Sequence, residues 1–144
     1  MGRDHRKLRV FQDADAAVLD VYRATNSMPS SERFGLQAQI RRAAVSVPTH
    51  IVEGAARVSE VEYGRFIHIA HASSRECEYR RGLAARLGMV DVDQCQVLLC
   101  TYNAVSGALN QLAAFLDTSE EGHPRRAPSL KTQAPRPETS LKRP

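Results

Sequence analysis

Apolar residues recur every three or four positions through four stretches of the chain, the spacing of a helix with one buried face. No stretch alternates with a period of two over a useful length, so no β-sheet is expected. The four stretches run from Phe11 to Met28, from Leu36 to Ala55, from Tyr63 to Leu87 and from Leu98 to Leu116. This pattern predicts an all-α protein.

Helix boundaries support the same count. Ser59 and Glu62 have the spacing of a capping box, which fixes a helix start at Ser59. Gly88 suits the left-handed conformation that ends a helix, and Asp91 suits the cap of the next one. Because the links are short, consecutive helices must run antiparallel. Residues 10–117 are therefore predicted to form an antiparallel up-down-up-down four-helix bundle.

Pro48 lies inside the second predicted helix. A proline there removes a backbone donor, presses on the carbonyl four residues earlier and moves the preceding residue away from helical angles. The cost is roughly 3 kcal/mol in an isolated helix, so packing must hold any bend. We expect a Pro-kinked second helix; two shorter helices meeting at residues 47–48 are the alternative.

The positive charge lies at the two ends of the chain. Formal net charge is +4, yet residues 10–117 carry ten basic against twelve acidic side chains. Residues 1–9 hold four basic against one acidic side chain and are predicted to be a basic N-terminal arm. Residues 118–144 hold six against three and five of the seven prolines, which predicts a disordered C-terminal tail.

The cysteines and the hydropathy pattern indicate a compartment. Cys77, Cys95 and Cys100 form no CxxC pair, and their odd number is typical of reduced thiols. The start of the chain lacks the apolar run of a secretory signal, and no stretch approaches the roughly 18 apolar residues of a membrane helix. A soluble, cytoplasmic protein without a membrane partner is expected.

A second set of polar positions follows the second predicted helix beside its apolar stripe. Their spacings of three and four place them on one helix face, and Glu53 and Arg57 have the order and spacing of an ion pair. The face is either a solvated surface with local pairs or a subunit or helix interface. We call these positions the polar row: Gln39, Arg42, Ser46, His50, Glu53 and Arg57.

The stretch MPSSERFGLQAQIRRAAVSVPTHIVEGAARVSEVEYGRFIHIAHASSRECE resembles the bacterial four helix bundle protein family, also called the 23S rRNA-intervening sequence proteins. The resemblance covers about residues 8–116. Three positions depart from the family pattern, with His50 in place of Asn, Val52 in place of Ala and Ala72 in place of Gly. The family signature falls on Gln39, Arg42, Ser46, Glu53, Gly54, Arg57 and Ser59.

The resemblance implies more than a fold. It implies a four-helix monomer that assembles into a homopentameric ring. The related accessory variability determinant of diversity-generating retroelements also assembles in this way and binds nucleic acid and a reverse transcriptase. No catalysis is known for the family.

The residues indicate no enzyme. In His50 and Glu53 the order of the Glu-x-x-His pair of bundle metal sites is reversed, and His68 and His71 lack a glutamate, so no metal is expected. Cys77 falls on an apolar seam, where packing is its expected role. No phosphate-binding glycine loop is present, so no nucleotide or other cofactor is expected.

Nucleic acid is the more interesting candidate partner. Arginines contact phosphates without reading sequence, and ring symmetry would multiply their charge. Against this stand the near-neutral body and the lack of an aromatic stacking platform. The sequence therefore predicts a non-enzymatic oligomeric scaffold that binds RNA or DNA or a partner such as a reverse transcriptase, with a pure protein-interaction module as the alternative. The candidate phosphate contacts are Arg41, Arg42, Arg57, Arg80, Arg81 and Arg86.

Overall fold

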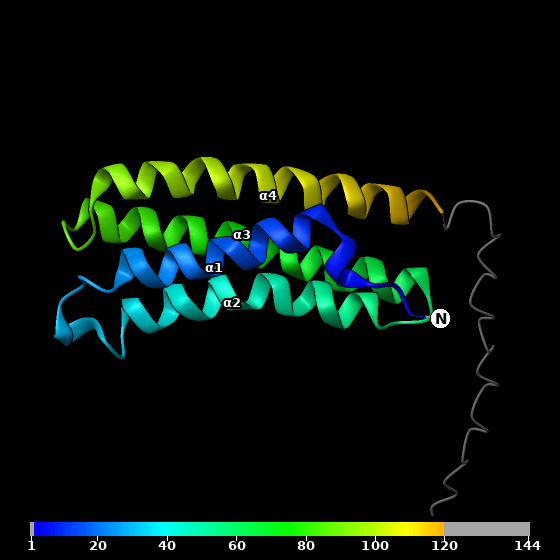
Figure 1. The fold of residues 1–144 in the computed structure, drawn as a ribbon, viewed down its shortest axis with the longest axis horizontal. Helices are drawn as coiled ribbons and strands as arrows, with labels where there is room; N and C mark the ends of the chain where they lie inside the picture. Colours follow the sequence, from blue (N-terminus) through cyan, green and yellow to red (C-terminus); the bar gives the residue numbers. More distant parts are fainter. Residues whose placement is uncertain (1, 120–144) are drawn as a thin grey trace, which may run out of the picture.

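A computed structural model describes residues 2–119 of the chain. Successive helices run in opposite directions along a common axis (Figure 1), so the predicted up-down-up-down bundle is confirmed. Two short 3-10 turns, η1 (His5–Lys7) and η2 (Ser30–Glu32), precede α1 and α2, and the described residues contain no strand. The helices are α1 (Arg9–Thr25), α2 (Leu36–Ala55), α3 (Glu60–Arg86) and α4 (Val92–Thr118).

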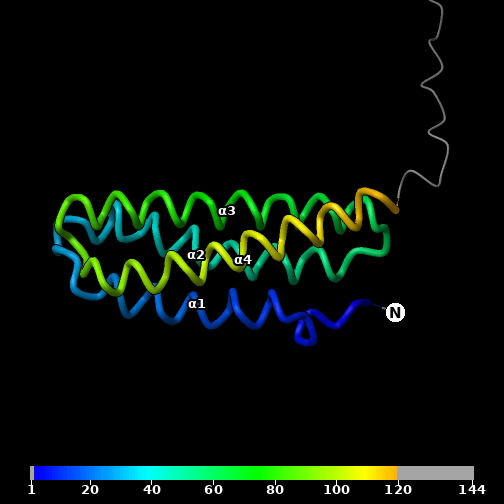
Figure 2. The backbone as a smooth tube through the Cα atoms, turned by 90° about the horizontal axis from the view of Figure 1, so that it is seen from above, coloured from blue at the N-terminus to red at the C-terminus, as the bar shows by residue number. Residues whose placement is uncertain are grey.

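The four helices form a square in cross-section. Two views at right angles place α1 opposite α3 and α2 opposite α4 (Figures 1 and 2). Each helix therefore packs against two neighbours, and α2 with α3 makes the most extensive contact. The α1–α2 and α3–α4 connections lie at one end of the bundle, here called the loop end, and the α2–α3 connection lies at the other end beside the N-terminus.

The core lies between the four predicted apolar stripes. Every helix contributes side chains with almost no exposed area, such as Val21, Ile40, Ile67 and Leu109. Removing these side chains from water is the main force that assembles the bundle. Leu87 departs from the prediction: α3 ends at Arg86, so this side chain lies beyond the helix and is exposed.

The predicted helix boundaries are confirmed by their capping bonds. The hydroxyl of Ser59 accepts a hydrogen bond from the Glu62 backbone N–H at 3.4 Å. The carboxylate of Asp91 accepts one from the Gln94 backbone N–H at 3.3 Å. Gly88 has a φ of 71°, the left-handed conformation that a helix stop favours.

Helix α2 runs through Pro48 without a break, so the alternative of two shorter helices is wrong. The proline ring is buried among the core residues of α2. The neighbouring Thr49 hydroxyl donates to the Val45 carbonyl at 2.8 Å. Packing of the helical turns on both sides of Pro48 thus offsets the loss of stability that this proline would cause in an isolated helix.

The N-terminal segment packs against the bundle and is not a free arm. The backbone N–H of Arg3 donates to the Ala55 carbonyl at 3.3 Å, and the Arg3 guanidinium donates to the Arg57 carbonyl at 3.0 Å. The same guanidinium lies 4.7 Å from the centre of the Tyr63 ring. Of the predicted disordered tail, residues 120–144 lie outside the described residues. None of the described helices is long and apolar enough to cross a membrane.

Candidate nucleic-acid and subunit interface

The polar row lies along the seam between α2 and α3. The Ser46 and Ser73 hydroxyls are hydrogen-bonded at 2.9 Å. The Gln39 carbonyl accepts from the Arg80 guanidinium at 3.3 Å. The Ser46 side chain therefore joins two helices of the same chain, as the helix-interface reading of the pattern expects, whereas the Gln39 contact uses its backbone carbonyl.

The predicted ion pair between Glu53 and Arg57 is wrong. Glu53 is bonded to the His50 ring at 2.9 Å, and the Arg57 guanidinium lies 4.8 Å from the centre of the Phe66 ring on α3. Sequence spacing predicted that His50, Glu53 and Arg57 share one helix face. It could not show that an aromatic ring of α3 holds the Arg57 guanidinium. The pairing leaves the Glu53 side chain 47% exposed.

Two of the candidate phosphate contacts, Arg41 and Arg42, lie side by side in sequence and differ in surroundings. The Arg41 guanidinium donates to the Thr25 hydroxyl at 2.9 Å and to the Tyr22 carbonyl at 3.3 Å, which ties α2 to the end of α1. It also lies 4.5 Å from the centre of the Tyr22 ring. Arg42 is exposed.

Three further candidates, of which Arg57 and Arg86 are exposed and Arg80 is half-buried, do not gather in one patch. Arg57 lies at the end of α2 beside the N-terminus, and Arg86 lies at the loop end. Arg80 forms an ion pair with Glu76 at 2.7 Å in addition to its bond with the Gln39 carbonyl. Within one protomer the structure therefore brings only Arg41 and Arg42 together.

The prediction that Arg81 contacts phosphate is wrong. Its side chain is 2% exposed, donates to the Cys95 carbonyl on α4 and lies 5.5 Å from the centre of the Tyr102 ring. A residue buried in this way cannot contact phosphate. The sequence held the signal, because position 81 follows Cys77 by four and precedes Ala84 by three and so lies on the apolar stripe of α3.

A groove that the sequence did not predict lies between the end of α1 and the first half of α2. It encloses about 630 Å³. Phe34, in the connection before α2, is 91% exposed, and Tyr22 is 43% exposed. Two accessible aromatic rings therefore lie in this groove. We call this feature the α1–α2 groove and use six of its lining residues: Tyr22, Arg33, Phe34, Arg41, Arg42 and Val45.

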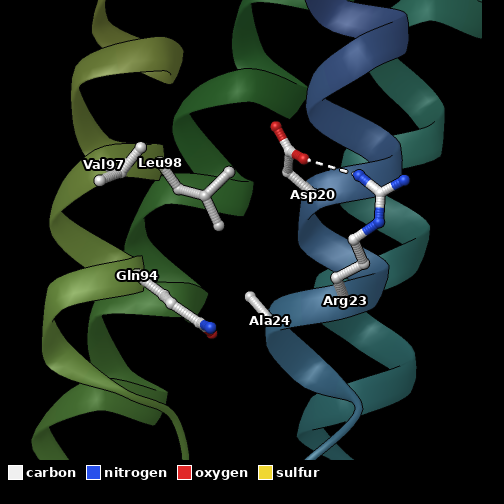
Figure 3. Close-up of a pocket in the computed structure, with 6 residues that line it drawn as sticks. All are labelled: Asp20, Arg23, Ala24, Gln94, Val97 and Leu98. Atoms are coloured by element: carbon white, nitrogen blue, oxygen red, sulfur yellow. Dashed lines mark hydrogen bonds and ion pairs between the residues drawn. The ribbon is translucent and has the colours of Figure 1, made fainter.

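A smaller hollow of about 280 Å³ lies between α1 and α4. Figure 3 shows Asp20 and Arg23 turned toward each other at its edge, where they are bonded at 3.1 Å, and Gln94 on the facing helix. The remaining lining is apolar, contributed by Ala24, Val97 and Leu98. Since its two charges are paired with each other, this hollow offers no unpaired charge to a ligand.

The sequence of residues 6–111 matches the model of the 23S rRNA-intervening sequence protein family. This chain belongs to that family. A solved structure of a protein of unknown function from the S23 ribosomal protein family of Bacteroides thetaiotaomicron is similar in fold, with a TM-score of 0.67 and 17% identity over 72% of this chain and 97% of that one. No curated protein matches the chain. The polar row and the α1–α2 groove both lie within the matched residues.

The structure shows the contacts of two residues, His50 and Ala72, at which this 23S rRNA-intervening sequence protein departs from the family pattern. His50 keeps a polar contact through its bond with Glu53 and lies 6.1 Å, ring centre to ring centre, from Phe66. Ala72 is exposed on α3, so its methyl group does not separate helices of this chain. The close approach of α2 to α3 occurs instead at Gly54, which is buried against Tyr63.

Other chemistry-bearing groups in residues 2–119 are dispersed. The His68 ring is bonded to the Asp117 carboxylate at 3.2 Å across α3 and α4. No group of three or more His, Cys, Asp or Glu side chains gathers in the described part of the chain. The buried Ser74 and Ser106 hydroxyls bond to each other at 2.6 Å. These contacts join helices, and none forms an array of ligands.

The Cys77 thiol is expected to resist alkylation in the folded protein. Burial raises the pKa of Cys77 to about 11, so only about 0.1% is thiolate at pH 8, and the thiolate is the reactive form. At pH 8 iodoacetamide should modify the exposed Cys100 at least a hundred times faster than Cys77. Peptide mass spectrometry measures the two rates. In urea the two rates should converge. Equal rates without denaturant would contradict the burial of this thiol.

Proposed function

We propose that this protein is a non-enzymatic scaffold of the bacterial cytoplasm that assembles with its own copies as a homopentamer and binds RNA or DNA or a nucleic-acid-processing partner such as a reverse transcriptase. The observation that carries the proposal is a group of arginines at the loop end of α2. No carboxylate oxygen of the described residues lies within 4.0 Å of Arg33, Arg41 or Arg42.

Arg57, Arg65 and Arg86 are also exposed without such a partner among the described residues, but Arg33, Arg41 and Arg42 line one groove together. Six described arginines each have an aspartate or glutamate partner, so their charge is already compensated. Unpaired positive charges held close together repel one another and gain most from a phosphate backbone, which also releases counterions. The compensated arginines are Arg3, Arg6, Arg9, Arg23, Arg75 and Arg80.

Filter binding of RNA and DNA across a salt series tests the proposal. We expect binding at 50 mM salt, with an affinity that falls linearly in a plot of log K against log salt. Arg42→Gln should reduce the slope of that plot by about 0.7 to 0.9, the loss of one phosphate contact. Arg75→Gln is the control, because Arg75 is paired with Glu78 at 2.9 Å. Absence of binding at low salt, or binding indifferent to salt, overturns the proposal.

A pure interaction module is the second candidate function. The observation in its favour is the number of large apolar side chains on the surface, among them Leu19, Val92 and Val97. Glu53→Ala separates the two functions in sedimentation, because within the described residues the Glu53 side chain is hydrogen-bonded to His50 alone. An unchanged oligomer that no longer binds RNA favours the scaffold. A dissociated oligomer, together with a wild-type protein that binds no nucleic acid, favours the interaction module.

A further inference from the structure

The α1–α2 groove has a one-sided charge. Three of its ten lining residues are arginines and none is aspartate or glutamate. The nearest acidic residue in sequence is Glu32, and its carboxylate accepts from the Leu36 backbone N–H at 2.9 Å at the start of α2. Glu32 is not one of the lining residues, so the lining itself carries three positive charges and no negative one.

Two aromatic rings of the same groove each lie beside a guanidinium. The Arg33 guanidinium lies 5.8 Å from the centre of the Phe34 ring, and the Arg41 guanidinium lies 4.5 Å from the centre of the Tyr22 ring. Phe34 is 91% exposed, so most of its surface faces solvent in spite of that contact. An exposed phenylalanine ring is unfavourable in water, and a flat π-surface would cover it well.

We infer that the α1–α2 groove binds a single-stranded segment of RNA or DNA. Arg42 and Arg33 contact phosphates, Phe34 stacks on an unpaired base, and Arg41 holds Tyr22 in place as the wall of the groove. A duplex does not fit this description, because its bases already stack on one another and offer no free base face to Phe34. The inference rests on the proposed function and adds the form of nucleic acid and the residues that select it.

Fluorescence anisotropy with the full chain tests the inference. The probes are labelled oligo(dT) and oligo(U) of twenty nucleotides, a twenty-base-pair DNA duplex, and an abasic strand of the same length. The wild-type protein should bind both single strands more tightly than the duplex. The abasic strand should bind more weakly than oligo(dT), because it keeps the phosphates and removes the bases.

Phe34→Ala is the decisive variant. Loss of one stacked base should weaken binding of oligo(dT) and oligo(U) by about fivefold to a hundredfold, and should leave binding of the abasic strand and the duplex unchanged. Phe115→Ala is the matched control, since Phe115 is also exposed, at 66%, but lies on α4 away from the groove. It should bind like the wild type.

Three results overturn the inference in different ways. If Phe34→Ala leaves single-strand binding intact while salt-dependent binding persists, the groove is not the site and the proposed function stands. If Phe34→Ala dissociates the oligomer in sedimentation and weakens all four probes equally, Phe34 belongs to a contact between copies of the chain. If no probe binds at 50 mM salt, the inference and the proposed function fail together.

Discussion

Replacing Arg81 by methionine is expected to raise the free energy of unfolding by about 1 to 3 kcal/mol. The Arg81 guanidinium is buried between α3 and α4 without a carboxylate partner in the described residues, and its Nε atom has no hydrogen-bond partner there. Its contacts with the Cys95 carbonyl and the Tyr102 ring offset part of the cost of removing a charge from water. Methionine fills the same space with a flexible apolar side chain and carries no such cost.

Urea unfolding followed by circular dichroism measures the effect, and two further variants interpret it. Arg81→Ala should be less stable than Arg81→Met by about 2 to 5 kcal/mol, because it leaves a cavity in the core. Arg86→Ala should change stability by less than about 0.5 kcal/mol, since Arg86 is exposed. If Arg81→Met is less stable than the wild type, the guanidinium supplies more to the fold than its visible contacts explain.

The Arg81→Met variant also tests whether Arg81 belongs to the core or to the nucleic-acid-binding surface. A buried Arg81 predicts that Arg81→Met binds nucleic acid with unchanged affinity and an unchanged salt slope. Arg42→Gln predicts the reverse, an unchanged stability with a smaller slope. Taken together, the two variants distinguish an arginine that packs from one that contacts phosphate, although the sequence presents both as members of an Arg-Arg pair.

Local sequence patterns predicted most of the fold, because the features that define the helices are local. The caps at Ser59 and Asp91 and the stop at Gly88 depend on residues within one or two turns of each other, and all three lie where they were predicted. The continuity of α2 through Pro48 was left open, since it depends on packing from the other helices. A local rule gives the cost of that proline but not the burial that offsets it.

The candidate site was harder to predict because its contacts join distant parts of the chain. Spacing predicted the polar row as one face of the second helix, although Arg57 lies beyond the end of α2 at Ala55. The Arg57 side chain lies against Phe66 and the Gln39 backbone carbonyl accepts from Arg80, both on α3, and no spacing rule identifies these partners. The α1–α2 groove was missed for the same reason. Its aromatic residues come from α1 and from the connection before α2, so only the fold brings them together.

Replacing Gly54 by alanine is expected to lower the free energy of unfolding by about 1 to 3 kcal/mol, although alanine is the better helix former. A Cβ atom at this position would lie 2.9 Å from the Phe66 Cβ and 2.9 Å from the Tyr63 Cδ2. The Phe66 Cβ is fixed to the backbone of α3, so the two helices must move apart. The Ser46–Ser73 bond and the contact of Arg57 with Phe66 lie along the seam that would open.

Gly107→Ala provides the matched control, because Gly107 is also inside a helix but a Cβ there meets nothing within 4 Å. That variant should gain about 0.5 to 1 kcal/mol from helix propensity alone, so the same substitution has opposite signs at the two sites. Urea midpoints give both values, and hydrogen exchange of the backbone amides of α2 should be faster in Gly54→Ala alone. A stabilised Gly54→Ala would mean that α2 and α3 are farther apart than the structure places them. In that case the polar row would be free to face a neighbouring subunit, and Glu53→Ala would be the first variant to examine by sedimentation.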